Sequence, residues 1–472
     1  MTTNSTGTAT SSQPHPFAAI QQAATQAGIA LDSPALAAHL DASDPVQTYR
    51  ADFHIPTYPQ ATSASANSSS QVVYLCGNSL GLQPKRTQEL LTQELQVWAE
   101  RGVMGHFDHP HNRPWVSIDE TVTGELAKIV GASADEVACM GSLTNNLHLL
   151  MVAFYRPTPT RFKILIEAKA FPSDTYAVAS QVKFHGFDPK DAVIALAPRD
   201  GEDTLRHEDI MRVIRDQGHE IALVMFSGVQ YYTGQLFDMR EITRAGQAAG
   251  CVVGWDLAHA VGNVPLHLHE WGVDFAAWCT YKYLNAGPGC IAGAFVHNKH
   301  RDTDLPRFAG WWGHDKQSRF KMPQTFQAMP GAAGFQLSNP SVVATVSLLG
   351  SLQVFAQTSM DALRSKSLRL TAYLEHLIDA VVVPRPSSHG VRLITPRDPF
   401  ARGAQLSLLF TEFASVSGLM RELESRGVVV DEREPNVIRV SPAPLYNTFQ
   451  DVRMFVDALC ESLDVLAAAK KA

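Results

Sequence analysis

The chain has 472 residues, of which 45% are hydrophobic and 18% charged, and its formal net charge is −7. This composition describes an ordinary globular protein with room for two or three domains and a large core. The mild negative charge gives no electrostatic reason to expect nucleic acid as a partner, and no apolar run approaches the roughly 18 residues of a membrane span.

The N-terminal part contains two low-complexity stretches. Residues 1–14 are rich in Thr and Ser and offer almost nothing to bury, so we expect a disordered tail. The stretch 61–70, built from Ala, Ser, Thr and Asn, predicts a surface loop. We expect it to interrupt an N-terminal segment, 15–80, that packs on a smaller second domain.

The two signals that report on compartment agree with each other. The N-terminus has neither the apolar stretch of a secretory signal nor the arginines of a mitochondrial presequence. Six cysteines are scattered without a C-x-x-C pair, and several lie in apolar runs, as expected in a reducing compartment. We therefore expect a cytoplasmic protein.

Residues 81–340 alternate short apolar runs with helix-like segments and predict the large domain of an α/β protein. The runs do not alternate apolar and polar residues, which is typical of strands buried on both faces of a mostly parallel sheet. The turn at 285–289 is too short for a helical crossover, so the two strands beside it should be antiparallel neighbours. The seven expected strands are 136–140, 162–166, 193–197, 221–226, 251–255, 275–279 and 291–296.

The pattern changes after Pro340, and residues 341–472 predict a second, smaller α/β domain. Apolar residues recur there at helical spacing in three segments, and four short β-rich runs lie between them. The expected helices are 341–357, 415–426 and 450–469, and the expected strands are 391–395, 405–410, 428–430 and 437–440.

Two residues at strand ends suggest a cofactor. Asp256 ends an apolar run, where an unpaired carboxylate would be costly, and Lys282 follows the next run between two tyrosines. A lysine amine can form a Schiff base with an aldehyde, and a carboxylate can keep a pyridine nitrogen protonated. The pair predicts pyridoxal phosphate. Taken singly, Asp256 also fits a structural salt bridge, and Lys282 an exposed surface lysine.

Three further segments could complete such a site. Leu143 and Thr144 lie in a loop of small and hydroxyl residues before a helical pattern, which suits a phosphate or an ordinary helix cap. Phe171 follows a strand and could stack on a flat ring or belong to the core. His259 could brace Asp256, reach the phosphate, or be structural.

Histidine groups and Arg439 are the remaining candidates. The groups His106/His109/His111 and His267/His269 lack cysteines and helical i, i+4 spacing, so we expect no metal. Arg439 lies in a short strand of the second domain. It could hold a substrate carboxylate with two hydrogen bonds or form an ion pair at the domain interface.

Together these segments resemble the kynureninase family of fold-type-I pyridoxal phosphate enzymes, from about residue 72 to 466. The motif detail is similar to the eukaryotic-type enzymes, which favour 3-hydroxykynurenine. Nine segments carry the resemblance in family order: 74–84, 169–174, 226–229, 253–263, 281–287, 310–314, 319–322, 336–340 and 439–446.

For the cofactor, the resemblance implies Lys282 as the Schiff-base lysine and Asp256 as the partner of the ring nitrogen. Phe171 would stack on the ring, with Asp174 close to it. The phosphate would be held by Leu143, Thr144, Ser227 and Tyr281, with His259 adjacent, and Trp311 and Asn339 would complete the pocket.

For the substrate, the resemblance implies that Arg439 binds the α-carboxylate. Part of the cofactor pocket would come across the interface of a homodimer. The residues facing the aromatic end would be Ser79, His106, Ser338 and Asn339. The spacer 107–112 looks longer than is usual in the family, which leaves the orientation of His106 and the preference for a 3-hydroxyl group open.

The family reaction is hydrolytic cleavage of the Cβ–Cγ bond of L-kynurenine or 3-hydroxy-L-kynurenine, in tryptophan catabolism and NAD synthesis. It yields anthranilate or 3-hydroxyanthranilate, plus L-alanine. Lys282 would act as general base, and Tyr281 is a candidate proton donor. Two alternatives stay open: a fold-type-I enzyme of the aminotransferase or cysteine desulfurase type, and a non-catalytic protein that keeps the fold.

Overall fold

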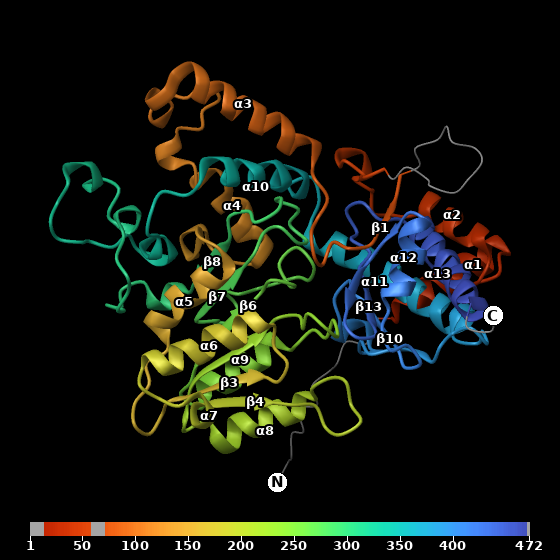
Figure 1. Ribbon diagram of the computed structural model, residues 1–472. Helices are drawn as coiled ribbons and strands as arrows, with labels where there is room; N and C mark the ends of the chain where they lie inside the picture. Colours follow the sequence, from red (N-terminus) through yellow and green to blue (C-terminus); the bar gives the residue numbers. More distant parts are fainter. Residues whose placement is uncertain (1–13, 58–70, 470–472) are drawn as a thin grey trace, which may run out of the picture.

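The computed structural model describes residues 14–57 and 71–469. The expected loop at 61–70, and all but the last residue of the expected tail at 1–14, lie outside the described residues. Within these ranges the chain forms a large domain around one sheet and a smaller domain that includes the first and the last of the described helices (Figure 1).

The large domain is built on a seven-stranded sheet. Strand β8 runs antiparallel to both of its neighbours, and the other strands are mutually parallel. All seven expected strands form, and the antiparallel pairing of the two strands beside the short turn is confirmed. Their order across the sheet is β2 (Val137–Cys139), β8 (Gly293–Val296), β7 (Phe275–Trp278), β6 (Val252–Asp256), β5 (Ile221–Ser227), β3 (Lys163–Glu167) and β4 (Val193–Leu196).

Consecutive strand residues are buried in different apolar clusters on the two faces of this sheet. Leu165 and Val224 pack with helices α4, α8 and α9, whereas Ile166 and Leu223 pack with α5 and α6. This two-sided burial is why the strands read as continuous apolar runs. The helices of the large domain are α3 (Lys85–Arg101), α4 (Glu120–Val130), α5 (Leu143–Phe154), α6 (Pro172–Phe184), α7 (Pro189–Ala192), α8 (His207–Gln217) and α9 (Met239–Ala248).

The smaller domain has an antiparallel sheet covered by helices. The sheet order is β12 (Asp431–Arg433), β13 (Val437–Val440), β10 (Leu406–Phe410) and β9 (Val391–Leu393). Its helices are α11 (Met360–Leu377), α12 (Ser417–Ser425) and α13 (Phe449–Ala469). Helix α11 and strand β12 were not expected from the sequence.

The N-terminal segment packs on the smaller domain. Helices α1 (Pro16–Ala27) and α2 (Pro34–Ala42) contribute to the same apolar cluster as α11 and α13. Strand β1 (Val73–Tyr74) pairs in parallel with β11 (Val428–Val429). The chain then crosses to the large domain through residues 75–84.

The expected domain boundary at 341 needs a correction, because helix α10 (Val342–Phe355) belongs to the large domain. It packs against α3 and α4, and Leu348 and Leu352 are buried in the large-domain cluster (Figure 1). The smaller domain therefore begins near α11. Among the described helices none alone is long and apolar enough to cross a membrane; α10 and 360–382 meet the criterion only as a pair bent by 77°.

Candidate functional site

Several of the expected site residues, together with Glu167, converge at one edge of the large sheet. Glu167, Ser227 and Asp256 are the last residues of β3, β5 and β6, and Ser227 lies opposite Asp256 in the strand register. Lys282 follows β7. Ligand sites of open α/β sheets form at this carboxyl edge, because the side chains after neighbouring parallel strands meet there.

Lys282 is held against a neutral histidine. Its Nζ lies 2.9 Å from Nε2 of His259, and 5.9 Å and 5.8 Å from the ring centres of Phe171 and Tyr281. Burial, and next the positive charge of Lys282, hold the pKa of His259 well below its usual range. His259 can therefore accept a hydrogen bond from Lys282 and orient its amine.

Asp256 is a buried carboxylate with an unusual set of partners. It accepts a hydrogen bond from Ala258 N at 2.7 Å and forms no salt bridge within residues 14–57 and 71–469. Burial raises the pKa of Asp174 well above its usual range, and so does the charge of the adjacent Asp256, to which it is hydrogen-bonded. A buried acid pair without a protein cation fits the ring nitrogen of pyridoxal phosphate.

The N-terminus of α5 suits the phosphate of the same cofactor. The helix begins at Leu143, and its N-cap residue Ser142 makes no side-chain hydrogen bond to the helix. The hydroxyl of Thr144 is 2.6 Å from that of Ser173, which places this helix end beside Phe171 and Asp174 at the start of α6. Uncapped N–H groups and a hydroxyl group at a helix N-terminus bind anions.

Residues 76–81 lie against the backbone of the lysine segment. Gly81 N donates to Tyr281 O at 2.8 Å, and a Cβ atom on Gly81 would lie 2.3 Å from Lys282 O. Only glycine permits this approach. Ser79 lies two residues before Gly81, so this close approach of the two backbones also places Ser79 near the Lys282 segment.

Arg439 reaches the site from the smaller domain, but it already has protein partners. This buried residue of β13 donates to Tyr231 O at 2.7 Å and forms an ion pair with Asp431. The ring of Tyr231 lies perpendicular to that of Phe171, with 5.2 Å between their centres. This ion pair lies within the sheet of the smaller domain, and the contact across the domain interface is the hydrogen bond to Tyr231 O. Nε of Arg439 has no partner among the described residues.

Ser338 and Asn339 lie beside the helix end rather than beside the lysine. They line a cavity of about 580 Å³ together with Gly141 and Asn145. The structure thus places these two residues next to the expected phosphate position.

His106 and Trp311 are not brought to Lys282 within one chain. The ring centre of His106 lies 5.4 Å from that of Trp115, and that of Trp311 lies 5.4 Å from that of Phe320. Among the residues that the structure describes, neither has a hydrogen bond or ring contact with Lys282. The pocket expected from the sequence is incomplete in the single chain.

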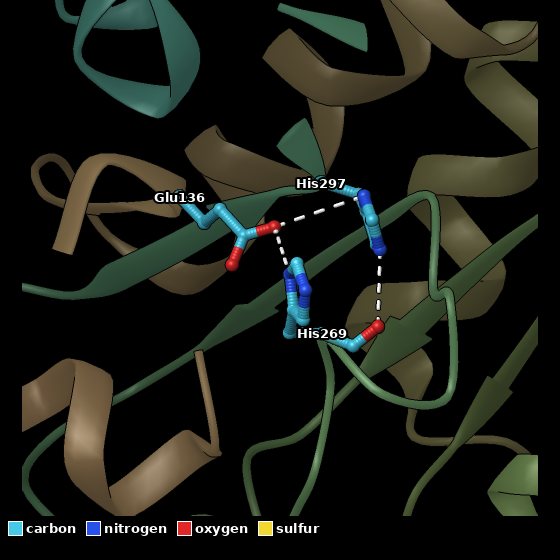
Figure 2. Close-up of side chains that lie close together, drawn as sticks. All are labelled: Glu136, His269 and His297. Atoms are coloured by element: carbon cyan, nitrogen blue, oxygen red, sulfur yellow. Dashed lines mark hydrogen bonds and ion pairs between the residues drawn. The ribbon is translucent and has the colours of Figure 1, made fainter. Parts of the chain in front are cut away.

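One histidine of each motif, His269 and His109, lies within hydrogen-bond distance of a buried glutamate. Figure 2 shows that Glu136 accepts a hydrogen bond from His269 at 2.8 Å, while Nε2 of His297 donates to His269 O at 3.0 Å. Asn298 N also donates to the Glu136 carboxylate, at 2.9 Å. In the other motif, His109 lies 3.0 Å from the Glu94 carboxylate.

Three residues of the site escaped the sequence reasoning. Glu167 ends the apolar run of β3 in the way that Asp256 ends β6, and that shared pattern was a usable signal. Tyr231 gave no signal, because it contacts Arg439 only where the two domains pack together. Asp431 contacts Arg439 from the adjacent strand β12, which was not expected from the sequence.

Comparisons with known proteins find relatives over most of the chain. A family model described as the kynureninase C-terminal domain matches residues 363–459. The kynureninase of Monosiga brevicollis is 51% identical over 460 residues, covering 94% of this chain and 99% of that protein.

Two solved structures share the fold at low identity. A cysteine desulfurase from Escherichia coli gives a TM-score of 0.70 at 18% identity, covering 88% of this chain and 98% of that one. A mutant of C-DES with glycine covalently linked to its PLP cofactor gives a TM-score of 0.70 at 16% identity, covering 82% and 96%.

Proposed function

This chain belongs to the kynureninase family, and we infer that it cleaves L-kynurenine or 3-hydroxy-L-kynurenine hydrolytically at the Cβ–Cγ bond, at the site around Lys282. The products are anthranilate or 3-hydroxyanthranilate, plus L-alanine, which places the reaction in tryptophan catabolism and NAD synthesis. The observation that carries the assignment to this site is that Lys282 and the buried Asp256, which forms no salt bridge among the described residues, lie after neighbouring strands at the same edge of the sheet. The 51% identity favours this reaction over that of a desulfurase, a likeness that rests on fold alone.

The residues present can hold pyridoxal phosphate without rearrangement of the strands. Asp256 would hold the ring nitrogen, and Phe171 would cover one face of the ring. The N-terminus of α5, together with Thr144, would bind the phosphate. When bound, the cofactor accepts the electron pair released at the substrate α-carbon. Asp174, which burial keeps protonated, would donate to Asp256 and fix the orientation of that carboxylate.

Lys282 and Tyr281 would carry the proton transfers. The hydrogen bond to neutral His259 orients Nζ of Lys282, which can take the α-proton of the substrate. Burial, and next the neighbouring Cys279, raise the pKa of Tyr281, so its hydroxyl group stays protonated near neutral pH. Tyr281 is therefore suited to donate a proton rather than to accept one.

Chemical trapping tests the cofactor assignment. Borohydride reduction of the cofactor-loaded protein should attach the pyridoxyl group covalently to Lys282, where peptide mass spectrometry would find it. Attachment at another lysine, such as Lys169 beside the site, would contradict the assignment.

Arg439 is assigned to the α-carboxylate of the substrate. Loss of a charge-assisted bidentate contact costs about 1.5–3 kcal/mol, so Arg439→Lys should raise KM by roughly 10- to 100-fold. Arg392→Lys is the matched control, because Arg392 pairs with Asp203 in an exposed interface contact. A fall in kcat at unchanged KM would contradict this role.

We also propose a cytoplasmic homodimer. All six cysteines are buried and unpaired, in keeping with a reducing compartment. An exposed aromatic patch, defined by Phe107, Trp311 and Phe320, has exposed fractions of 63%, 45% and 49%. Such a patch on one subunit suits an interface, and it would carry His106 and Trp311 toward the site of the partner.

Complementation between variants tests the shared site. Lys282→Ala and Trp311→Ala proteins should each be impaired, yet a re-equilibrated equimolar mixture should recover about a quarter of wild-type activity. Half of its dimers would then be mixed, each with one intact site. A mixture no more active than its components would place Trp311 in the site of its own chain or outside any site.

A further inference from the structure

Glu167 is a buried acid at the site edge that none of the roles above uses. It is 3% exposed, and its carboxyl group faces Ser227 on the neighbouring strand. It accepts a hydrogen bond from the hydroxyl group of Ser227, and Ser227 N lies 3.3 Å and 3.4 Å from its two oxygens. Ser227 in turn lies opposite Asp256, so Glu167 is one residue removed from the proposed ring-nitrogen partner.

The surroundings of Glu167 favour a dissociable proton. No salt bridge is formed by Glu167 in the described part of the chain, and burial raises its pKa to about 7. The hydrogen bonds from Ser227 oppose this rise, and the charge of Asp256 adds to it. Asp174 on α6 also senses the charge of Glu167.

Glu167 also lines a cavity of about 310 Å³. Water in this cavity would lie close to Glu167 and would give its proton a route for exchange. The charged residues that line the same cavity are Lys169, Arg199, Asp200, Glu202 and Asp203.

The protonation state of Glu167 decides what the Ser227 hydroxyl group can do. When Glu167 is ionised, both the N–H and the O–H of Ser227 point at its carboxylate, as observed. When it is protonated, the acid can donate to Oγ of Ser227 while its other oxygen still accepts from the N–H. The hydroxyl hydrogen of Ser227 is then free to donate to an anionic oxygen of a ligand.

We propose that Glu167 is a positioning residue that binds a proton when the cofactor binds, and so turns the Ser227 hydroxyl group into a hydrogen-bond donor toward it. The inference rests on the proposed function, because it requires a cofactor with an anionic oxygen at Ser227. Binding that selects the acid form raises the pKa of Glu167. The affinity for the cofactor is therefore at its maximum below pH 7 and falls about tenfold for each pH unit above it.

The experiment compares apo wild type with Glu167→Gln by calorimetric titration between pH 6 and pH 8. The probe is 4′-deoxypyridoxine phosphate, which lacks the aldehyde and reports binding without a bond to Lys282. The glutamine amide donates to Oγ of Ser227 permanently, as the acid form does. The ratio of the Kd of wild type to that of Glu167→Gln should therefore rise about tenfold from pH 6 to pH 8. Titrations in buffers of different ionisation enthalpy should show proton uptake in wild type that the variant lacks.

Two further variants make the test specific. Glu136→Gln alters another buried glutamate, immediately before the edge strand β2, and should follow wild type at every pH. Ser227→Ala removes the hydroxyl group. The Kd of this variant should therefore exceed that of wild type most strongly at pH 6, and the two Kd values should approach each other by pH 8. This second measurement holds even if Glu167→Gln fails to fold.

The outcomes separate the two proposals. A wild-type protein that does not bind the probe at any pH would overturn the proposed function and this inference with it. Probe binding with a ratio that stays constant across the pH range would overturn the inference alone. A merely structural role of Glu167 would change the Kd by the same factor at every pH.

Discussion

Lys282→Ala should lower turnover by at least about 10⁴-fold, because one side chain supplies both the covalent attachment of the cofactor and the general base. His259 cannot replace it as a base, since burial, the larger cause of its low proton affinity, persists when Lys282 is removed. The variant should fold normally, because the contacts of the Lys282 side chain are one hydrogen bond and two ring faces. Steady-state kinetics on cofactor-saturated protein measures the loss.

Amine rescue distinguishes a missing base from a distorted site. Methylamine added to Lys282→Ala should restore part of the turnover, in proportion to the concentration of its free base. The matched control is Lys183→Ala, which removes an exposed lysine of α6 and should leave kcat unchanged. Retention of more than about a hundredth of wild-type turnover by Lys282→Ala would exclude Lys282 as the base.

Asp256→Asn should lower kcat by roughly 10²- to 10⁴-fold, since breaking one side of a buried charge pair costs about 3–5 kcal/mol. The amide keeps the shape of the carboxylate and its contact with Ala258 N, but it cannot hold a protonated ring nitrogen. The loss should therefore appear with cofactor still bound. Kinetics at saturating cofactor, together with the absorbance of the bound cofactor, measure both quantities.

Asp256→Asn should also change the pKa of Asp174. Because the charge of Asp256 helps to raise the pKa of Asp174, its loss should lower that pKa. Carboxyl infrared bands of wild type and Asp256→Asn would report the change. Asp203→Asn, at an exposed ion pair, is the control. Activity of Asp256→Asn within about tenfold of wild type would remove Asp256 from its assigned role.

The sequence predicted the large sheet well, because its strands are buried on both faces and so differ plainly from the helices between them. It could not place helix α10. That segment is apolar on most sides, and a helix of this kind can be buried against either domain. Only the packing against α3 and α4 decides the domain to which it belongs.

The candidate site was predictable where the chemistry lies at strand ends. Asp256 and Lys282 follow consecutive strands, so their proximity comes from the sheet itself. The contact between Arg439 and Tyr231 could not be predicted, because Tyr231 lies 208 residues away and contacts Arg439 only where the two domains pack together. Glu167 was overlooked although it ends its strand as Asp256 does.

Product analysis tests the central claim most directly. Cofactor-loaded protein is incubated separately with L-kynurenine and 3-hydroxy-L-kynurenine, and the aromatic product is followed by fluorescence while alanine is assayed. We predict equal amounts of aromatic product and alanine, with the larger kcat/KM for 3-hydroxy-L-kynurenine. Equal amounts with a larger kcat/KM for L-kynurenine would overturn only the substrate preference. Absence of both products from protein with bound cofactor would contradict the assignment of this chain's reaction.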